Sequence, residues 1–138
     1  MKVVHILNEL KFSGAEIMYV DAAEKLKSLG CSLYVINTNQ TLGEYAPFFA
    51  KSGYKVIHMP YPQSVVGRFK FYNKLIDFLR KEQIDVVHIH AEGPAFFCWI
   101  PKLFGKRVVN TIHGLDWNRE KWHGSVASKF IRGGEKNA

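Results

Sequence analysis

Residues 3–37 read VVHILNELKFSGAEIMYVDAAEKLKSLGCSLYVIN, and this stretch decides the fold. It begins with a compact apolar run that is typical of a buried strand. Residues 15–30 then place apolar side chains at helical spacing, and Gly30 is a stop signal for that helix. Because a second apolar run follows at residues 32–37, the stretch predicts a strand, a helix and another strand.

Strands and helices continue to alternate through the rest of the chain. This pattern predicts an α/β fold, a Rossmann-like parallel sheet with helices on both faces. No strand follows the last predicted helix, so we expect residues 1–138 to form one domain that is truncated. Further strands are predicted at residues 54–60, 85–90 and 107–114, and further helices at residues 44–53, 68–84 and 94–105 and from a Ser125 cap onward.

The composition indicates a globular domain. The chain has 138 residues and is 47% hydrophobic, which suits one domain with a real core. It has no run of about eighteen apolar residues, so no membrane-spanning helix is expected. The amino-terminal residues lack the features of a signal peptide. Cys31 and Cys98 lie in apolar surroundings without CxxC spacing, which predicts buried free thiols in a reducing cytosol.

The chain is basic, with a formal net charge of +7. A cationic domain attracts phosphate groups in nucleotides, nucleic acids or lipid headgroups. No nucleic-acid-binding module is recognisable, so no nucleic-acid partner is expected. The helix predicted at residues 68–84 carries basic and aromatic side chains together, which is typical of a helix on an anionic membrane surface. The alternative is an ordinary amphipathic helix with a solvated basic face.

The end of the first predicted strand offers a candidate binding loop. Ligands of open parallel α/β sheets bind outside the carboxyl ends of the strands. Here Ser13 and Gly14 open the following helix, where bare backbone and free N–H groups favour an anion. The alternative is an ordinary tight turn, with Ser13 as the helix N-cap and Glu16 as its capping-box partner.

Histidines mark the ends of the next two candidate strands. His88 and His90 face the same way on the strand at residues 85–90, with His90 nearer its end and Glu92 in the loop beyond. His88 is expected to be a partnered core histidine. No cysteine or paired carboxylates join the two imidazoles, so no metal site is expected.

The strand at residues 107–114 delivers His113 to its carboxyl end, and a polar and aromatic segment follows. We expect Gly14, His90 and His113 to lie along one common groove at the carboxyl ends of the strands. Asp116 and Trp117 could line the rim of this groove, because Trp rings stack on sugars. The alternatives are solvated loop histidines and Trp residues that only pack against the fold.

Three common nucleotide and hydrolase motifs are missing. A dinucleotide-binding unit needs GxGxxG after the first strand and an acidic residue after the second, whereas residues 37–40 read NTNQ. The P-loop and the GxSxG elbow are absent as well. The sequence therefore disfavours NAD-dependent oxidoreductases, NTPases and α/β-hydrolases.

The motifs taken together resemble a known family. KVVHILNELKFSGAEIMYVDAAEKLKSLGCSLYVI resembles the opening of retaining glycosyltransferases of the GT4 type. DVVHIHAEG and VVNTIHG resemble the fourth and fifth strand ends of that family. The segments HGLDWNREKW and SKFIRGGEKNA resemble a subgroup that makes bacterial surface polysaccharides.

This resemblance implies a GT-B architecture, in which two Rossmann-like domains face each other across a cleft. The amino-terminal domain mainly holds the acceptor, and the carboxyl-terminal domain mainly holds the nucleotide sugar. Because the chain matches only the first, the resemblance implies an acceptor-side domain that lacks the donor-binding domain and is inactive alone. Its partners would be a nucleotide-sugar donor and a glycan or lipid-linked acceptor, in the cytoplasm or at the inner face of the plasma membrane.

The resemblance also implies roles for the strand-end residues. The loop around Gly14 would approach the donor diphosphate, although Ala15 stands where the family usually has a second glycine. His113 would be catalytic through contact with the transferring sugar, while His90 and Glu92 would shape the acceptor side. The family transfers sugar without a bound metal, so no cofactor is expected. A non-catalytic, flavodoxin-like binding or regulatory domain is the alternative function.

Overall fold

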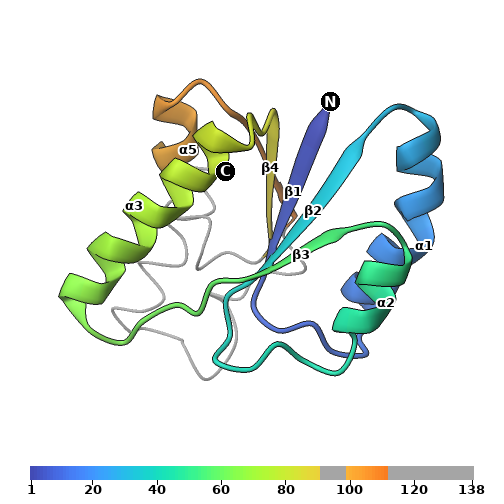
Figure 1. Cartoon of the computed structure of the whole chain (residues 1–138), viewed down its shortest axis with the longest axis horizontal. Helices are drawn as coiled ribbons and strands as arrows, with labels where there is room; N and C mark the ends of the chain where they lie inside the picture. The colour runs from blue at the N-terminus through green and yellow to red at the C-terminus, as the bar shows by residue number, and fades with distance from the viewer. Residues whose placement is uncertain (91–98, 112–138) are drawn as a thin grey trace, which may run out of the picture. The chain divides into compact units, whose positions relative to one another are not determined.

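The computed structural model describes residues 1–90 and 99–111 (Figure 1). Its strands form a parallel sheet in the order β3-β2-β1-β4-β5, which confirms the predicted α/β class. The chain divides into two compact units, Met1–Asp85 and Val86–Ala138. The described elements are β1 (Lys2–Leu7), α1 (Gly14–Ser28), β2 (Ser32–Asn37), α2 (Ala46–Lys51), β3 (Lys55–His58), α3 (Val65–Lys81), β4 (Val86–His90), α5 (Trp99–Leu103) and β5 (Arg107–Thr111).

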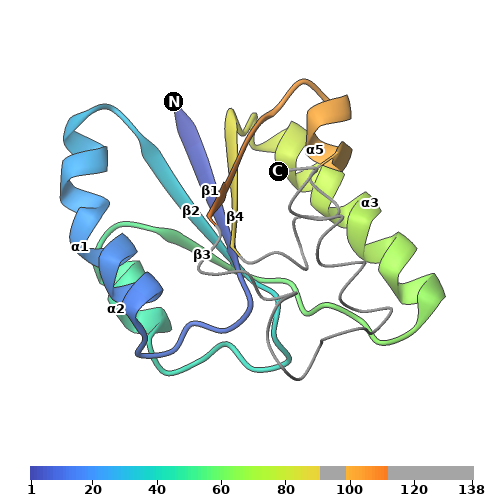
Figure 2. The ribbon, with the colours of Figure 1, turned by 180° about the vertical axis from the view of Figure 1, so that it is seen from behind.

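In the first unit, helices cover both faces of the strands. His5 of β1 pairs with Val35 of β2, so both side chains point to one face, and Tyr34 points to the other. The His5 ring lies 4.4 Å from the ring of Tyr19 in α1. The Tyr34 ring lies 6.0 Å from the ring of Phe78 in α3. Figures 1 and 2 accordingly show α1 and α2 on one side of these strands and α3 on the other.

Helix α1 ends where the sequence predicts. Gly30 has a φ of +79°, a conformation that glycine adopts without steric cost. The N–H of Cys31 donates to the carbonyl oxygen of Leu26, and the N–H of Gly30 donates to that of Lys27. These two bonds form a Schellman motif, which satisfies carbonyl groups at the helix end.

Helix α3 is shifted by three residues from the prediction of residues 68–84. It begins at Val65 because Ser64 caps it, accepting a hydrogen bond from the N–H of Gly67 at 3.1 Å. It ends at Lys81, since Gln83 takes a positive φ of 54° and turns the chain toward β4. The prediction placed the start too late because the first three residues of the helix, Val65, Val66 and Gly67, are weak helix formers.

The second unit contains β4, α5 and β5. Strands β4 and β5 are parallel, and His90 pairs with Thr111 at their carboxyl ends. Strand β5 agrees with the prediction of residues 107–114 over its described part, and α5 ends at Leu103, two residues before the predicted end. The helix predicted from Ser125 lies outside the described residues.

Two further sequence predictions can be compared with the described part of the chain. Cys31 is a buried free thiol, as predicted, while Cys98 lies outside the described residues. Among the described helices, none combines the length and the apolar character that a membrane span requires.

Candidate functional site

The loop after β1 leads into the start of α1. Ser13 has extended backbone angles and occupies the N-cap position, as the capping-box alternative expected. Its side chain makes no capping hydrogen bond to the backbone, however, and its hydroxyl donates to the carboxylate of Glu16 instead. The expected capping box is therefore not formed, because the two side chains bond to each other and not to the backbone. Glu16 itself is buried in the first turn, where a negative charge is favoured by the helix dipole.

Gly14 is exposed, and the space around it is open. A Cβ atom built at this position would meet no protein atom within 4 Å. The fold therefore does not need a glycine here for steric reasons. Bare backbone at the start of a helix remains accessible to a group from outside.

A second loop, between β2 and α2, is fixed against the loop after β1. Asn37, at the end of β2, is fully buried and donates from Nδ2 to the carbonyl oxygen of Leu42 at 2.9 Å. The N–H of Tyr45 donates to the carbonyl oxygen of Leu10 at 2.9 Å. Gly43 has a φ of +90°, and a Cβ there would lie 2.2 Å from the same oxygen. These contacts hold the two loops together at the carboxyl edge of the strands.

Three aromatic rings gather at this junction, and the sequence analysis did not identify them. Phe12 packs edge to face on Tyr45 with ring centroids 5.5 Å apart, and Phe48 stacks on Tyr45 at 4.6 Å. Tyr45 is buried, whereas Phe12 is 70% exposed and Phe48 49% exposed. We call Phe12, Tyr45 and Phe48 the aromatic platform. The available signal was Gly43, which permits the turn that brings Tyr45 to Leu10.

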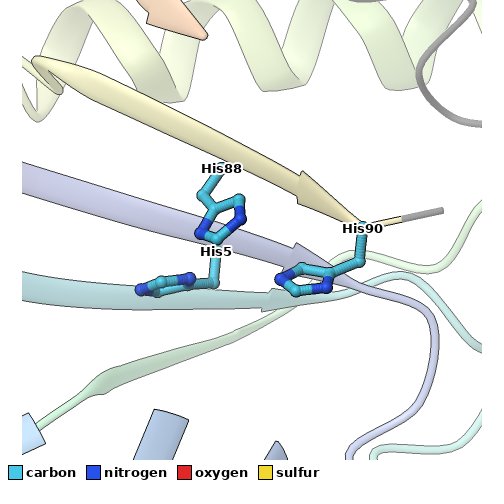
Figure 3. A group of neighbouring side chains, drawn as sticks. All are labelled: His5, His88 and His90. Carbon is cyan, nitrogen blue, oxygen red and sulfur yellow. The ribbon is translucent and has the colours of Figure 1, made fainter. Parts of the chain in front are cut away.

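The end of β4 carries the candidate histidine of the second unit. His90 is buried, and its ring centroid lies 4.6 Å from that of His88. Figure 3 draws both rings, together with His5 of β1. Nε2 of His88 lies 2.7 Å from Oγ1 of Thr111 on β5, so the two side chains share a hydrogen bond. The expectations that the two histidines face the same way and that His88 is partnered are therefore confirmed.

Imidazole nitrogens are common metal ligands, and His88 and His90 present two of them from one strand. The expectation that the protein holds no metal stays a prediction.

Four predicted site residues lie outside the described part of the chain: Glu92, His113, Asp116 and Trp117. Of the others, Ser13 and Gly14 are adjacent in the first unit and His90 belongs to the second. The predicted common groove for Gly14, His90 and His113 therefore stays a prediction.

Comparison with known proteins adds the family. The family model described as Glycosyltransferase Family 4 matches residues 12–137. The chain belongs to glycosyltransferase family 4. Membership in family 4 agrees with the parallel α/β sheet and confirms the resemblance at the level of the family. It also identifies a sugar donor and an acceptor as the general kinds of partner. No curated protein matches the chain significantly.

Proposed function

We propose that this family 4 domain is the acceptor-side half of a retaining glycosyltransferase that works in bacterial cell-surface polysaccharide synthesis. The enzyme transfers a sugar from a nucleotide sugar to a glycan or lipid-linked acceptor, in the cytoplasm or at the inner face of the plasma membrane. The observation that carries this proposal is the family match over residues 12–137. The donor-binding half lies outside these 138 residues, so the domain alone does not transfer sugar.

The reaction places negative charge on the leaving group. The bond between the sugar carbon and the donor phosphate breaks, and its electron pair leaves with the nucleoside diphosphate. The acceptor hydroxyl oxygen forms the new glycosidic bond, and its proton is released. Backbone N–H groups at a helix start can stabilise the departing diphosphate. The open space at Gly14 and the lack of a capping bond from the Ser13 side chain support a role for the start of α1 in this step.

Residues of the second unit act on the sugar and the acceptor in this proposal. His113 contacts the transferring sugar, His90 and Glu92 shape the acceptor side, and Asp116 and Trp117 form its rim. The position of His90 at the end of β4, with its ring against His88, supports a fixed imidazole there. A fixed imidazole can hold a hydroxyl group in one orientation.

The aromatic platform suits the acceptor sugar itself. The carbon-bound hydrogens of a sugar ring form an apolar face that packs on aromatic rings. Phe12 and Phe48 offer such rings at the carboxyl edge of β1 and β2. Exposing two phenylalanines to water is unfavourable unless a ligand covers them.

Sugar transfer by the full-length gene product tests this function. Radiolabelled nucleotide sugars are offered with a lipid extract and with soluble glycans, and label in the product is counted. We expect at least one donor to be used and His113→Ala to lower kcat about a hundredfold. His58→Ala is the matched control, since His58 is exposed at the end of β3. Transfer unchanged in His113→Ala, or no transfer from any donor, contradicts the proposal.

A further inference from the structure

The first two turns of α3 carry an exposed apolar surface. Val65, Val66 and Phe69 are 67%, 66% and 69% exposed. Residues three and four positions apart on a helix are neighbours, so these side chains form one patch. We call Val65, Val66 and Phe69 the α3 tip.

The core-facing stripe of the same helix is separate from this patch. Phe71, Leu75 and Leu79 are buried beneath the helix. Figures 1 and 2 show the first turns of α3 farther from the strands of their unit than its last turns. The exposed apolar side chains therefore belong to the projecting end of the helix and not to its whole length.

The surroundings of the α3 tip are cationic. Arg68 and Lys70 are exposed on the same turns, and Lys74 is exposed on the next turn. Residues 45–76 contain no aspartate or glutamate, and the first carboxylate of α3 is Asp77, beyond Lys74, so no carboxylate within the first two turns offsets Arg68 and Lys70. Apolar side chains ringed by Arg and Lys match the boundary between the acyl chains and the headgroups of an anionic bilayer.

The base of the α3 tip is preorganised. The Arg68 guanidinium lies over the Tyr61 ring, with Cζ 5.6 Å from the ring centroid. The hydroxyl oxygens of Tyr61 and Tyr72 lie 3.3 Å apart, and the Tyr61 ring packs on Phe71 at 5.1 Å. A tip held in this way loses little conformational freedom when it enters a bilayer.

We propose that the α3 tip inserts into an anionic phospholipid surface, with Arg68 and Lys70 on the headgroups. Two valines and one phenylalanine cover far less than the roughly 800 Å² per partner of a stable protein interface, which favours a lipid occupant. Insertion by the tip differs from a helix that lies flat on the membrane, which was one of the two alternatives that the sequence left open. The inference deepens the proposed function, because it names the surface at which a lipid-linked acceptor is met.

Vesicle co-sedimentation of the 138-residue chain tests the inference without any sugar substrate. The probes are vesicles of phosphatidylcholine alone and of phosphatidylcholine mixed with phosphatidylglycerol. We expect binding to the mixed vesicles only, weakened by salt. Phe69→Ser should lower the partition coefficient about tenfold. Arg68→Gln with Lys70→Gln should lower it about thirtyfold, because each basic residue near the surface contributes about fivefold.

Matched controls separate a local effect from a general one. Leu29→Ser removes a 67% exposed leucine at the end of α1, and Lys25→Gln with Lys27→Gln removes the same charge elsewhere. Both should bind vesicles like the wild type. Equal losses in the control and α3 variants would overturn the proposal, as would equal binding to both kinds of vesicle or no binding at all.

A tryptophan placed at the tip reports insertion directly. The wild-type chain contains three Trp residues, so its spectrum is subtracted from that of Phe69→Trp. The remaining emission should shift to the blue with mixed vesicles and be quenched by brominated lipid. Glycerol 3-phosphate should not reverse the shift, which separates a bilayer from a phosphate site. An unshifted or unquenched signal would refute insertion. Such a failure would leave the proposed sugar transfer standing, since transfer to soluble glycans is measured separately.

Discussion

The hydroxyl of Ser13 donates a hydrogen bond to the carboxylate of Glu16, within the first turn of α1. A carboxylate at this position interacts favourably with the helix dipole as well as with the hydroxyl. We expect Glu16→Gln to lower the free energy of unfolding by about 1 kcal/mol, measured by urea titration. Glu24→Gln, on the exposed face of the same helix, should change it much less. Equal effects of the two substitutions would show that the Ser13 contact contributes nothing.

The two loop glycines should respond in opposite ways to alanine. At Gly14 a Cβ meets no protein atom, so Gly14→Ala should leave the melting temperature unchanged or raise it slightly. At Gly43 a Cβ would lie 2.2 Å from the Leu10 carbonyl oxygen, so Gly43→Ala should cost about 2 kcal/mol or more.

The Gly14 variant also tests donor binding. In the full-length gene product, Gly14→Ala should weaken nucleotide-sugar binding about tenfold by crowding the start of α1. Calorimetry measures the dissociation constant. Unchanged donor affinity in a normally folded Gly14→Ala protein would remove the diphosphate from this loop.

The fold class could be predicted because its signals are local. Hydrophobic spacing within residues 3–37 defines β1, α1 and β2, and the stop at Gly30 was located correctly. The start of α3 was misplaced because a side-chain cap at Ser64 outweighed poor helix formers in the first turn. A single capping bond is worth about as much as several propensity differences.

The site was less accessible to sequence reasoning because it depends on contacts between distant residues. The pairing of Tyr45 with Leu10 joins two loops that are separated by a helix and a strand. Spacing along the chain does not reveal such a contact, so the aromatic platform was missed. The orientation of His88 and His90 was predictable, since alternation along a single strand fixes it.

Gln83 occupies a position at which glycine is usual. It has a φ of 54°, and Ile84 donates to the Leu79 carbonyl oxygen at 3.0 Å, the same arrangement that ends α1. A side chain in the left-handed region is strained, so Gln83→Gly should raise the free energy of unfolding by about 0.5–1 kcal/mol. The reverse change, Gly30→Gln, should lower it by a similar amount. Urea titration of both variants decides the matter, and destabilisation by Gln83→Gly would be the contrary result.

The Tyr54 hydroxyl links stability to alkaline pH. It donates to the Tyr19 carbonyl oxygen at 3.1 Å, and burial raises its pKa above the ordinary value of 10. A raised pKa in the folded state means that the stabilisation is complete below pH 10 and is lost as the pH rises through the folded-state pKa.

Replacing Tyr54 by phenylalanine isolates this contribution. Tyr54→Phe should lose about 1 kcal/mol at neutral pH, and its difference from the wild type should shrink above pH 10. Phenolate absorbance is measured against pH in the folded wild type and in folded Tyr54→Phe. The difference between the two proteins should rise only above pH 10. A step at or below that pH would show that the hydroxyl is not protected by burial.

Phe12 tests whether the aromatic platform holds the acceptor. Its ring is 70% exposed and touches Tyr45 only edge to face, so Phe12→Ala should leave folding intact. In the full-length gene product we expect the KM for a glycan acceptor to rise about fivefold, because a stacked ring contributes about 1 kcal/mol. The KM for the nucleotide sugar should stay the same if the platform binds the acceptor and not the donor, as proposed. Leu29→Ala, an equally exposed apolar truncation at the end of α1, is the control and should change neither constant. A parallel rise in both KM values would instead mean that Phe12 acts on the loop that leads into α1, and an unchanged acceptor KM would remove the platform from the acceptor site.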